Sequence, residues 1–385
     1  MHSRKVTARP IEHAPPRSYV ATPPDTWLFA AVAALVAFGL IMVYSASSAT
    51  AFAEHGDAAY YMKRQLVWLV VGCVLAVAAF QMDYQKLRKP APYLLLGAIV
   101  LLVLVLVPHV GLSVNGARRW IGASAVSLQP SEFAKLALVV YLAAILSTRG
   151  ERITQLASGL APLCVPVFLL ALLVLKEPDM GTASIFVFVA FTMFFAAGAR
   201  VPHLAAIAAA TLPIVLFTVM SSSYRRARIF AFLDPWKDPQ NTGFHIVQSL
   251  LALGSGGLFG VGLGASRAKF FYLPEQYTDF IFAVIGEELG MIGGLFVLAV
   301  FVLIAYRGVK IALAATDRFG YFLAIGCTAM IVLQAFVNIG VVTASWPVTG
   351  VPLPFISFGG SSLIVNLVAV ALVANVGRRR RVNAP

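Results

Sequence analysis

Four carboxylates lie before and inside one strongly apolar stretch, FFYLPEQYTDFIFAVIGEELG. Glu275 and Asp279 precede the apolar run, whereas Glu287 and Glu288 lie within it. Asp279 lies at the mouth of the run, where water and a polar substrate could reach it, so it could act as a general base on a reacting hydroxyl. A carboxylate at a helix start could instead cap the helix and complement its dipole. Position alone leaves both interpretations open.

If the run is a helix, Glu287 and Glu288 lie in different surroundings from Asp279. They lie about 12 Å further along it, at a rise of about 1.5 Å per residue. At about 100° per residue, Glu287 falls within about 80° of the Asp279 face and Glu288 points to the opposite side. Glu287 and Glu288 therefore cannot both share the environment of Asp279. Because a charge in mid-membrane costs about 2.5–3.5 kcal/mol, the sequence favours a structural role for both, as partners in buried hydrogen bonds or ion pairs.

Basic residues occur in other segments that are predicted to share the outer side with Asp279. Arg118 and Arg119 stand in NGARRWIG, Lys135 follows Glu132 by one helical turn, and Arg225, Arg226 and Arg228 stand in SSSYRRARIF. Such cations would bind an anion, above all a diphosphate, because Arg offers paired donors and Lys a point charge. Side chains that snorkel to lipid headgroups would also explain each position taken singly.

The elements that must position these residues are membrane helices. Of the 385 residues, 60% are hydrophobic and 12% are charged, and the mean hydropathy is +0.86. Soluble domains carry about a quarter charged residues, so the chain is predicted to be a polytopic membrane protein. Its net charge of +13 indicates no nucleic-acid partner, because the basic residues lie in short loops between apolar runs. Cys73, Cys164 and Cys327 fall in apolar runs and indicate neither a disulfide nor a zinc site.

Ten apolar runs approach the length of about 20 residues that a helix needs to cross a bilayer. We expect an all-α polytopic membrane protein with a large extracytoplasmic loop, 221–279, between spans 7 and 8. The spans are predicted at 27–48, 65–82, 91–108, 131–147, 155–175, 182–199, 202–221, 280–306, 319–343 and 359–376. Pro162 and Pro166 interrupt the fifth run, and kinked helices of this kind survive in bundles.

The charge pattern predicts the orientation. Ten spans place both termini on one side, and most of the 29 Lys and Arg lie in segments on that side, so both termini are predicted to be cytoplasmic. The chain then divides into a disordered cytoplasmic tail at 1–26, a membrane domain at 27–376 and a basic cytoplasmic tail at 377–385. We expect a multi-pass protein of the cytoplasmic (inner) membrane.

Two glycine-rich stretches and the histidines carry weaker signals. LGSGGLFGVGLGAS and SFGGSS lack the strand context of a phosphate-binding loop, so we expect close-packed backbone at membrane depth there. His109 and His245 fall in outer segments without visible partners, and no order of Ser, His and Asp typical of a hydrolase is present.

Several motifs together carry a family resemblance that runs in order along almost the whole chain. They are NGARRWI, QPSEFAK, EPDMGTA, YRRARIFAFLDPWKDP, GFHIVQSL, LPEQYTDFIFAVIGEELG and PLPFISFGGSSL. This combination resembles the SEDS family (shape, elongation, division and sporulation) of ten-span peptidoglycan glycosyltransferases. FAVIGEELG and WPVTGVPLPFISFGG are more similar to the division branch, FtsW, or its sporulation relative than to the elongation branch, RodA.

The resemblance implies that the protein joins the disaccharides of lipid II, carried on undecaprenyl diphosphate, into glycan strands at the outer membrane face. Asp279 matches the family's essential aspartate and is our candidate general base. The matching cations Arg119, Lys135 and Arg228 are expected to engage the diphosphate, together with the neighbouring Arg118 and Arg225. Glu132, Asp179 and Glu275 are expected to shape the site. Tyr277, Lys176 and Glu177 depart from the family pattern.

The resemblance also implies partners. A class B penicillin-binding protein, which is a transpeptidase, and other division proteins are expected. Mg²⁺ or Mn²⁺ could share the diphosphate, and no organic cofactor is expected. An α-linked donor and a β-linked product imply a single inverting displacement, which needs no covalent carboxylate intermediate. A lipid II flippase and a noncatalytic division scaffold are the alternative functions.

Overall fold

Most of the described chain is helical, as the apolar runs predict. The computed structural model describes residues 19–21, 23–114, 117–123, 126–267, 269 and 273–381, so most of the predicted 1–26 tail and the end of the 377–385 tail lie outside the described residues. The helices are α1 (Thr26–His55), α2 (Tyr60–Gln81), η1 (Tyr84–Leu87), α3 (Ala91–Leu106), α4 (Pro130–Arg149), η2 (Gly150–Thr154), η3 (Leu156–Leu160), α5 (Ala161–Lys176), α6 (Met180–Ala196), α7 (Val201–Met220), α8 (Ser223–Leu233), η4 (Pro235–Lys237), α9 (Phe244–Gly256), α10 (Ile281–Leu313), α11 (Arg318–Val342) and α12 (Gly360–Gly377).

Ten of these helices, α1 to α7 and α10 to α12, lie where the ten spans were predicted. Among the described residues, eight helical segments are long and apolar enough to cross a membrane, and α3 and α6 are apolar but shorter. The fifth segment continues from η3 into α5 with Pro166 inside the helix. The helical, multi-pass class is therefore confirmed, and the number of spans stays a prediction.

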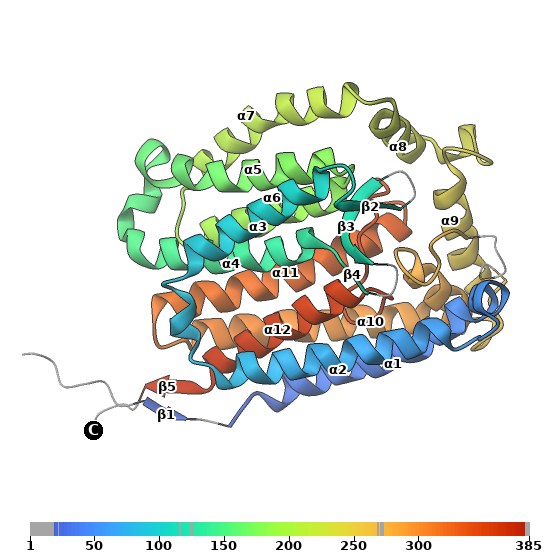
Figure 1. The fold of residues 1–385 in the computed structure, drawn as a ribbon, viewed down its shortest axis with the longest axis horizontal. Coiled ribbons are helices and arrows are strands. Elements are labelled where there is room, and N and C mark those ends of the chain that lie inside the picture. Colours follow the sequence, from blue (N-terminus) through green and yellow to red (C-terminus); the bar gives the residue numbers. More distant parts are fainter. Residues whose placement is uncertain are drawn as a thin grey trace, which may run out of the picture.

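The helices pack around α11 and α12, which are the most buried spans (78% and 89% of their apolar windows). α2 packs along α12 yet buries only 11% of its window, so it has a face for lipid. α7 runs along the outside of the bundle (Figure 1) and buries only Leu204 and Val219.

The two ends of the bundle differ (Figure 1). At one end, β1 (Tyr19–Ala21) pairs antiparallel with β5 (Arg379–Arg381), so the two ends of the described chain lie side by side. At the other end lie α8, α9 and an antiparallel sheet of β2 (Gly111–Val114), β3 (Ala117–Ala123) and β4 (Val126–Leu128).

The two longest segments that were predicted to be extracytoplasmic are more ordered than the sequence predicted. Residues 111–114, 117–123 and 126–128 form the sheet, which the apolar pattern did not predict. The segment 221–279, predicted as a loop, contains α8, η4 and α9. Both segments therefore give this end of the bundle a defined surface.

The glycine-rich stretch packs against a break in α10. Gly290 has φ 66° and ψ −162°, values that interrupt the helix. The amides of Val261 and Gly262 donate to the carbonyls of Glu287 and Glu288 at 3.0 Å, and the amide of Met291 donates to Gly257 O at 2.9 Å. These bonds satisfy backbone groups that the break frees, which agrees with the expectation of close-packed backbone in this stretch.

Candidate active site

A cavity of about 670 Å³ opens at the end of the bundle that carries the sheet, α8 and α9. Asp279, Glu275, Arg119 and Arg228 line it. Its other described lining residues are Arg64, Trp68, Trp120, Ser127, Gln129, Tyr224, Ala227, Ala231, Asn241, Thr242, His245, Pro274, Thr278, Val348, Gly350, Pro352, Phe358, Gly359, Gly360 and Ser362. Segments far apart in the sequence thus contribute to one site.

The backbone around Asp279 is held on both sides. The amides of Thr278 and Phe280 both donate to Glu275 O, at 3.2 and 3.1 Å, and form a tight turn in which Glu275 has φ 54°. From α11, Asn338 Nδ2 donates to Asp279 O at 2.7 Å.

The segment before α12 holds the same turn from the other direction. Ser357 Oγ donates to Thr278 O at 2.5 Å, and the amide of Phe358 donates to Tyr277 O at 2.9 Å. The PLPFISFGG motif thus helps to orient the turn that carries Asp279.

The carboxyl group of Asp279 makes no hydrogen bond or ion pair with another described residue. Burial raises the pKa of Asp279 from its ordinary value of 3.8 to about 7. Glu275 and Asp179 raise this pKa further, whereas Arg119 and Arg228 oppose the rise. The group is therefore poised to gain or lose a proton near neutral pH.

Gly350 separates Asp279 from Arg119. A Cβ atom built at Gly350 would lie 3.4 Å from Asp279 Oδ2 and 3.4 Å from Arg119 Nη1, so the two groups face each other across this glycine. Gly350 also has φ 76°, which L side chains rarely adopt. Glycine at this position keeps the approach between the carboxyl and the guanidinium open.

Arg119 is oriented by two backbone carbonyls. Its Nε donates to Glu177 O at 2.9 Å, and its Nη2 donates to Pro178 O. Alternate side chains of a strand point to opposite faces, so Arg118, the preceding residue of β3, is exposed and does not line the cavity. The structure therefore brings only Arg119 of this pair to the cavity wall.

Arg228 reaches the cavity from α8. Its Nη1 donates to Val348 O at 3.1 Å, and its guanidinium carbon lies 4.5 Å from the ring centroid of Tyr224, one helical turn earlier. Burial lowers the pKa of Arg228, which stays charged. Arg225 instead donates to Thr218 O and Leu175 O and does not line the cavity.

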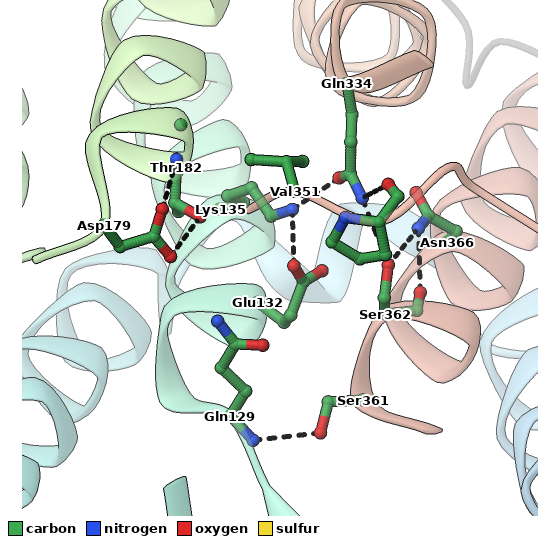
Figure 2. A network of polar contacts seen from close by, with 12 residues as sticks. Gln129, Glu132, Lys135, Asp179, Thr182, Gln334, Val351, Ser361, Ser362 and Asn366 are labelled. Atoms are coloured by element: carbon green, nitrogen blue, oxygen red, sulfur yellow. Dashed lines mark hydrogen bonds and ion pairs between the residues drawn. The ribbon is translucent and has the colours of Figure 1, made fainter. Parts of the chain in front are cut away.

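Lys135 and Glu132 do not line the cavity. Figure 2 shows Lys135 between Glu132 and Gln334. Both are buried, and Lys135 Nζ contacts Glu132 Oε1 at 2.9 Å and also Gln334 Oε1. Gln334 Nε2 then donates to Pro352 O at 2.9 Å and to Ser362 Oγ at 3.1 Å. The ion pair thus supports two residues of the wall.

Asp179 is also outside the wall. It caps α6, since its carboxylate accepts from Thr182 N and Thr182 Oγ1, both at 2.9 Å (Figure 2). Its charge still reaches the cavity, because it raises the pKa of Asp279.

Glu177 is a buried acid for which no role in the site was predicted. It is fully buried, and neither carboxyl oxygen has a hydrogen-bond partner among the described residues. Burial, helped by Asp179 and opposed by Arg119, raises the pKa of Glu177 to about 9. A neutral Glu177 leaves the charge of Arg119 available to the cavity.

The cavity also contains His245, whose partner the sequence did not reveal. Its ring stacks on the ring of Phe280, the residue directly after Asp279, at a centroid distance of 5.6 Å. Arg64, Trp68 and Gln129 are further wall residues that the sequence did not single out. Arg64 and Trp68 lie on α2, Gln129 directly precedes α4 and His245 lies on α9, so no spacing along the chain indicates that they meet.

Glu287 and Glu288 of α10 lie outside the cavity and contact residues of the segment before α10. Glu287 accepts from Ser266 Oγ at 2.5 Å and from Arg267 N at 2.9 Å. Glu288 accepts from Ser45 Oγ at 2.7 Å and lies 3.5 Å from Lys269 Nζ. These contacts fit the structural role that the sequence favoured.

Three comparisons place the chain among known proteins. Residues 25–382 match the model of a family, FtsW/RodA/SpoVE, that is described as "Cell cycle protein". The chain is 47% identical over 348 residues to the "Probable peptidoglycan glycosyltransferase FtsW" of Geobacter metallireducens, across 90% of this chain and 93% of the relative. It is 46% identical over 360 residues to the "Stage V sporulation protein E" of Bacillus subtilis, across 94% and 98%.

Solved structures resemble the fold. One is a chain from "Structural coordination of polymerization and crosslinking by a peptidoglycan synthase complex", with a TM-score of 0.76, 30% identity and coverage of 92% of this chain and 98% of that one. The rod shape determining protein RodA of Thermus thermophilus gives a TM-score of 0.68 at 30% identity, with coverage of 92% and 97%.

Proposed function

The chain belongs to the FtsW, RodA and SpoVE family of cell cycle proteins, and from this membership we propose that it polymerises lipid II into glycan strands during cell division. It is a peptidoglycan glycosyltransferase of the FtsW-like branch, to which several of its relatives at 45–47% identity belong by name. The observation that carries the assignment of roles is the position of Asp279. Its carboxyl group lies without a described partner in a cavity that is also lined by two arginines, Arg119 and Arg228, which backbone carbonyls hold in place.

Asp279 acts as the general base. Its carboxylate takes the proton of the attacking sugar hydroxyl while the hydroxyl oxygen forms a bond to the anomeric carbon of the second saccharide. A pKa of about 7 suits this task, because a base is most effective when its pKa lies near the working pH. A single displacement by one dominant carboxylate inverts the configuration at the anomeric carbon.

Arg119 and Arg228 hold the leaving group. The bond between the anomeric carbon and the lipid diphosphate breaks, and its electron pair remains on the diphosphate. Guanidinium groups that are already oriented stabilise this charge at little reorganisation cost. Arg119 faces Asp279 across Gly350, so the base and the anion-binding group are side by side.

Residues next to the reacting groups, most of them outside the cavity lining, support Asp279 and the two arginines. We assign Lys135 and Glu132 to positioning of the 352–362 segment through Gln334, and Asp179 to the charge around Asp279. Glu275 shapes the turn before Asp279, and Arg118 and Arg225 stay outside the contacts to the reacting groups.

A divalent cation fits this arrangement. Mg²⁺ is commonly held by one or two carboxylates together with substrate phosphates. Among the described residues, no group of three or more His, Cys, Asp and Glu side chains could hold a metal ion by itself. The ligands would therefore be Glu275, which lines the cavity, together with oxygens of the diphosphate. Bound Mg²⁺ or Mn²⁺ would neutralise charge on the departing diphosphate.

The family and the charge pattern predict the membrane orientation and the partner proteins. We propose an orientation in the cytoplasmic membrane with both termini inside and the cavity outside. The related synthase complex joins polymerisation to crosslinking by its own description, and we propose a class B penicillin-binding protein and other division proteins as partners of this chain.

Polymerisation of lipid II by the purified protein in detergent micelles tests the function. Micelles have no second compartment, so a flippase would leave lipid II unchanged, whereas a polymerase yields glycan strands that gel electrophoresis resolves. Parallel reactions with the transpeptidase partner and with a chelator measure the contribution of each. Wild-type protein that folds, binds lipid II and forms no polymer under all of these conditions would contradict the assignment.

A further inference from the structure

His245 lines the cavity but takes no part in the proposed proton transfer or in holding the diphosphate. It lies in the first turn of α9, and its ring stacks on the ring of Phe280, the residue directly after Asp279. The charges of Arg228 and Glu275 both act on this ring. His245 therefore lies next to the groups to which the reaction is assigned.

Aromatic and polar neighbours hold the ring of His245 in place. Phe280 stacks on it at an interplanar angle of 21°, and Phe244 packs against it edge-on, with 6.4 Å between the ring centroids. Just before α9, the amide of Phe244 donates to Asn241 O at 3.2 Å, and Asn241 Nδ2 donates to Asp238 Oδ1 at 2.9 Å. A polar group that is already held in place binds a ligand at a smaller entropic cost.

The two ring nitrogens of His245 have different surroundings. Nδ1 is enclosed by the protein and has no hydrogen-bond partner among the described residues. Nε2 also makes no hydrogen bond with a described residue, but it is not enclosed. Because the ring lines the cavity, Nε2 is the nitrogen that a molecule in the cavity can reach.

Burial and charge together favour a neutral imidazole with its proton on Nε2. Burial lowers the pKa of His245 and the positive charge of Arg228 lowers it further, whereas Glu275 opposes this shift, so the ring is neutral at pH 7. A neutral imidazole carries its proton on one nitrogen and accepts with the other. Enclosed N–H groups without an acceptor are rarer in proteins than enclosed acceptors without a donor. His245 thus presents an uncharged N–H donor to the cavity.

The saccharide of lipid II offers an acceptor that matches this donor. Its amino sugars carry acetamido groups, whose carbonyl oxygen only accepts, whereas each hydroxyl group both donates and accepts. An anion is matched better by a charged donor, and Arg119 and Arg228 already supply such donors in the cavity. An uncharged N–H group therefore suits the acetamido oxygen better than the diphosphate.

We propose that His245 Nε2 donates a hydrogen bond to the acetamido oxygen of a lipid-linked amino sugar, and that this contact makes the cavity selective for N-acetylated saccharides. The inference rests on the proposed function, because it takes lipid II as the substrate. The contact orients the saccharide while Arg119 and Arg228 hold the diphosphate. A site that donates to a substrate oxygen discriminates against an analogue without that oxygen, because the buried donor is then left unpaired.

Binding of lipid II and of altered saccharides tests this contact. The probes are lipid II and two analogues, each with the acetamido group of one of the two sugars replaced by a hydroxyl. The full chain with Asp279→Asn, which should block turnover, is titrated with each probe in detergent micelles. Adding His245→Phe keeps a ring against Phe280 and removes the N–H donor. It should weaken lipid II binding about threefold to tenfold, the range for loss of one uncharged hydrogen bond. With the analogue that lacks the contacted acetamido group, it should cause no further loss.

His203 of α7 is the matched control. Its Nδ1 is likewise enclosed without a partner among the described residues, but His203 does not line the cavity. His203→Phe should therefore bind all three probes as its parent does. His245→Gln keeps a side-chain N–H donor and should restore part of the affinity. Thermal unfolding checks that each variant folds, and His245→Leu replaces His245→Phe in the same comparison if the larger ring prevents folding.

Two results would overturn the proposal. One is a folded His245 variant without the donor that binds lipid II as tightly as its parent. The other is an equal loss with lipid II and with both analogues, which would assign the effect to the fold or to other parts of the substrate. Failure of the proposed function is a different result, a wild-type chain that forms no polymer. In a chain that does polymerise lipid II, either of the two binding results counts against the role of His245 alone.

Discussion

Replacement of Asp279 by Asn should stabilise the protein while it removes turnover. Burial, together with Glu275, raises the pKa of Asp279 from 3.8 to about 7. Between these two pH values the folded protein binds a proton that the unfolded chain has released. The free energy of unfolding therefore falls as the pH rises through this window, and the loss is complete above about pH 7.

The size of the effect follows from the same shift. At roughly 1.4 kcal/mol per pH unit, ionising this carboxyl group costs the folded protein about 4 kcal/mol. Because the side chain is only partly buried against the cavity, solvent reduces this cost, and we expect about 2–4 kcal/mol. An amide carries no charge, so Asp279→Asn should recover this free energy at pH 8 and almost none of it at pH 4.

Thermal unfolding of both proteins in the same detergent, from pH 4 to pH 8, measures the difference. Asp238 is the matched control, because its hydrogen bonds from Asn241 and Thr242 lower its pKa. Asp238→Asn should therefore not stabilise the protein at neutral pH. The reasoning is wrong if Asp279→Asn is no more stable than the wild type at pH 8, or if its advantage does not change with pH.

Three further outcomes are expected. The kcat/KM for lipid II should fall about tenfold per pH unit below about pH 7 as Asp279 gains a proton, and a profile without an inflection near pH 7 would count against its role as base. Arg119→Gln should reduce turnover about 10²–10³-fold, as loss of a transition-state donor does, whereas Arg118→Gln should change it little because Arg118 is exposed; equal losses in a polymerisation assay would refute the distinction. Glu287→Gln should lower the free energy of unfolding by about 1–3 kcal/mol through weaker contacts to Ser266 and Arg267, and a fully stable variant without turnover would show a direct catalytic role instead.

The membrane helices were predictable from the sequence because the bilayer sets their length and composition. The fifth predicted span, 155–175, is observed as η3 and α5 despite Pro162 and Pro166. The break at Gly290 was not predictable, because a single glycine in an apolar run is compatible with a continuous helix. Only the packing of the 257–262 backbone against α10 reveals it.

The sequence predicted which residue types form the candidate site, but only part of the residues that line it. Asp279, Arg119 and Arg228 line the cavity, whereas Lys135 does not and is held by Glu132 and Gln334. The small sheet decides between Arg118 and Arg119, since strand alternation sends them to opposite faces, and the apolar pattern does not predict that sheet.

Wall residues from distant segments could not be grouped from the sequence. Arg64 and Gly359 line the same cavity because α2 packs along α12, nearly 300 positions later in the chain, where Gly359 N donates to Gln65. No spacing rule relates such positions, because packing between helices is set by whole faces rather than by single motifs.

Single-turnover polymerisation of lipid II by folded Asp279→Asn protein tests the central claim most directly. The account predicts that the variant binds lipid II, unfolds at a higher temperature than the wild type at pH 8, and loses polymerisation by about 10²–10⁴-fold, the usual contribution of a general base. A folded variant that polymerises lipid II at a rate close to the wild type would contradict it.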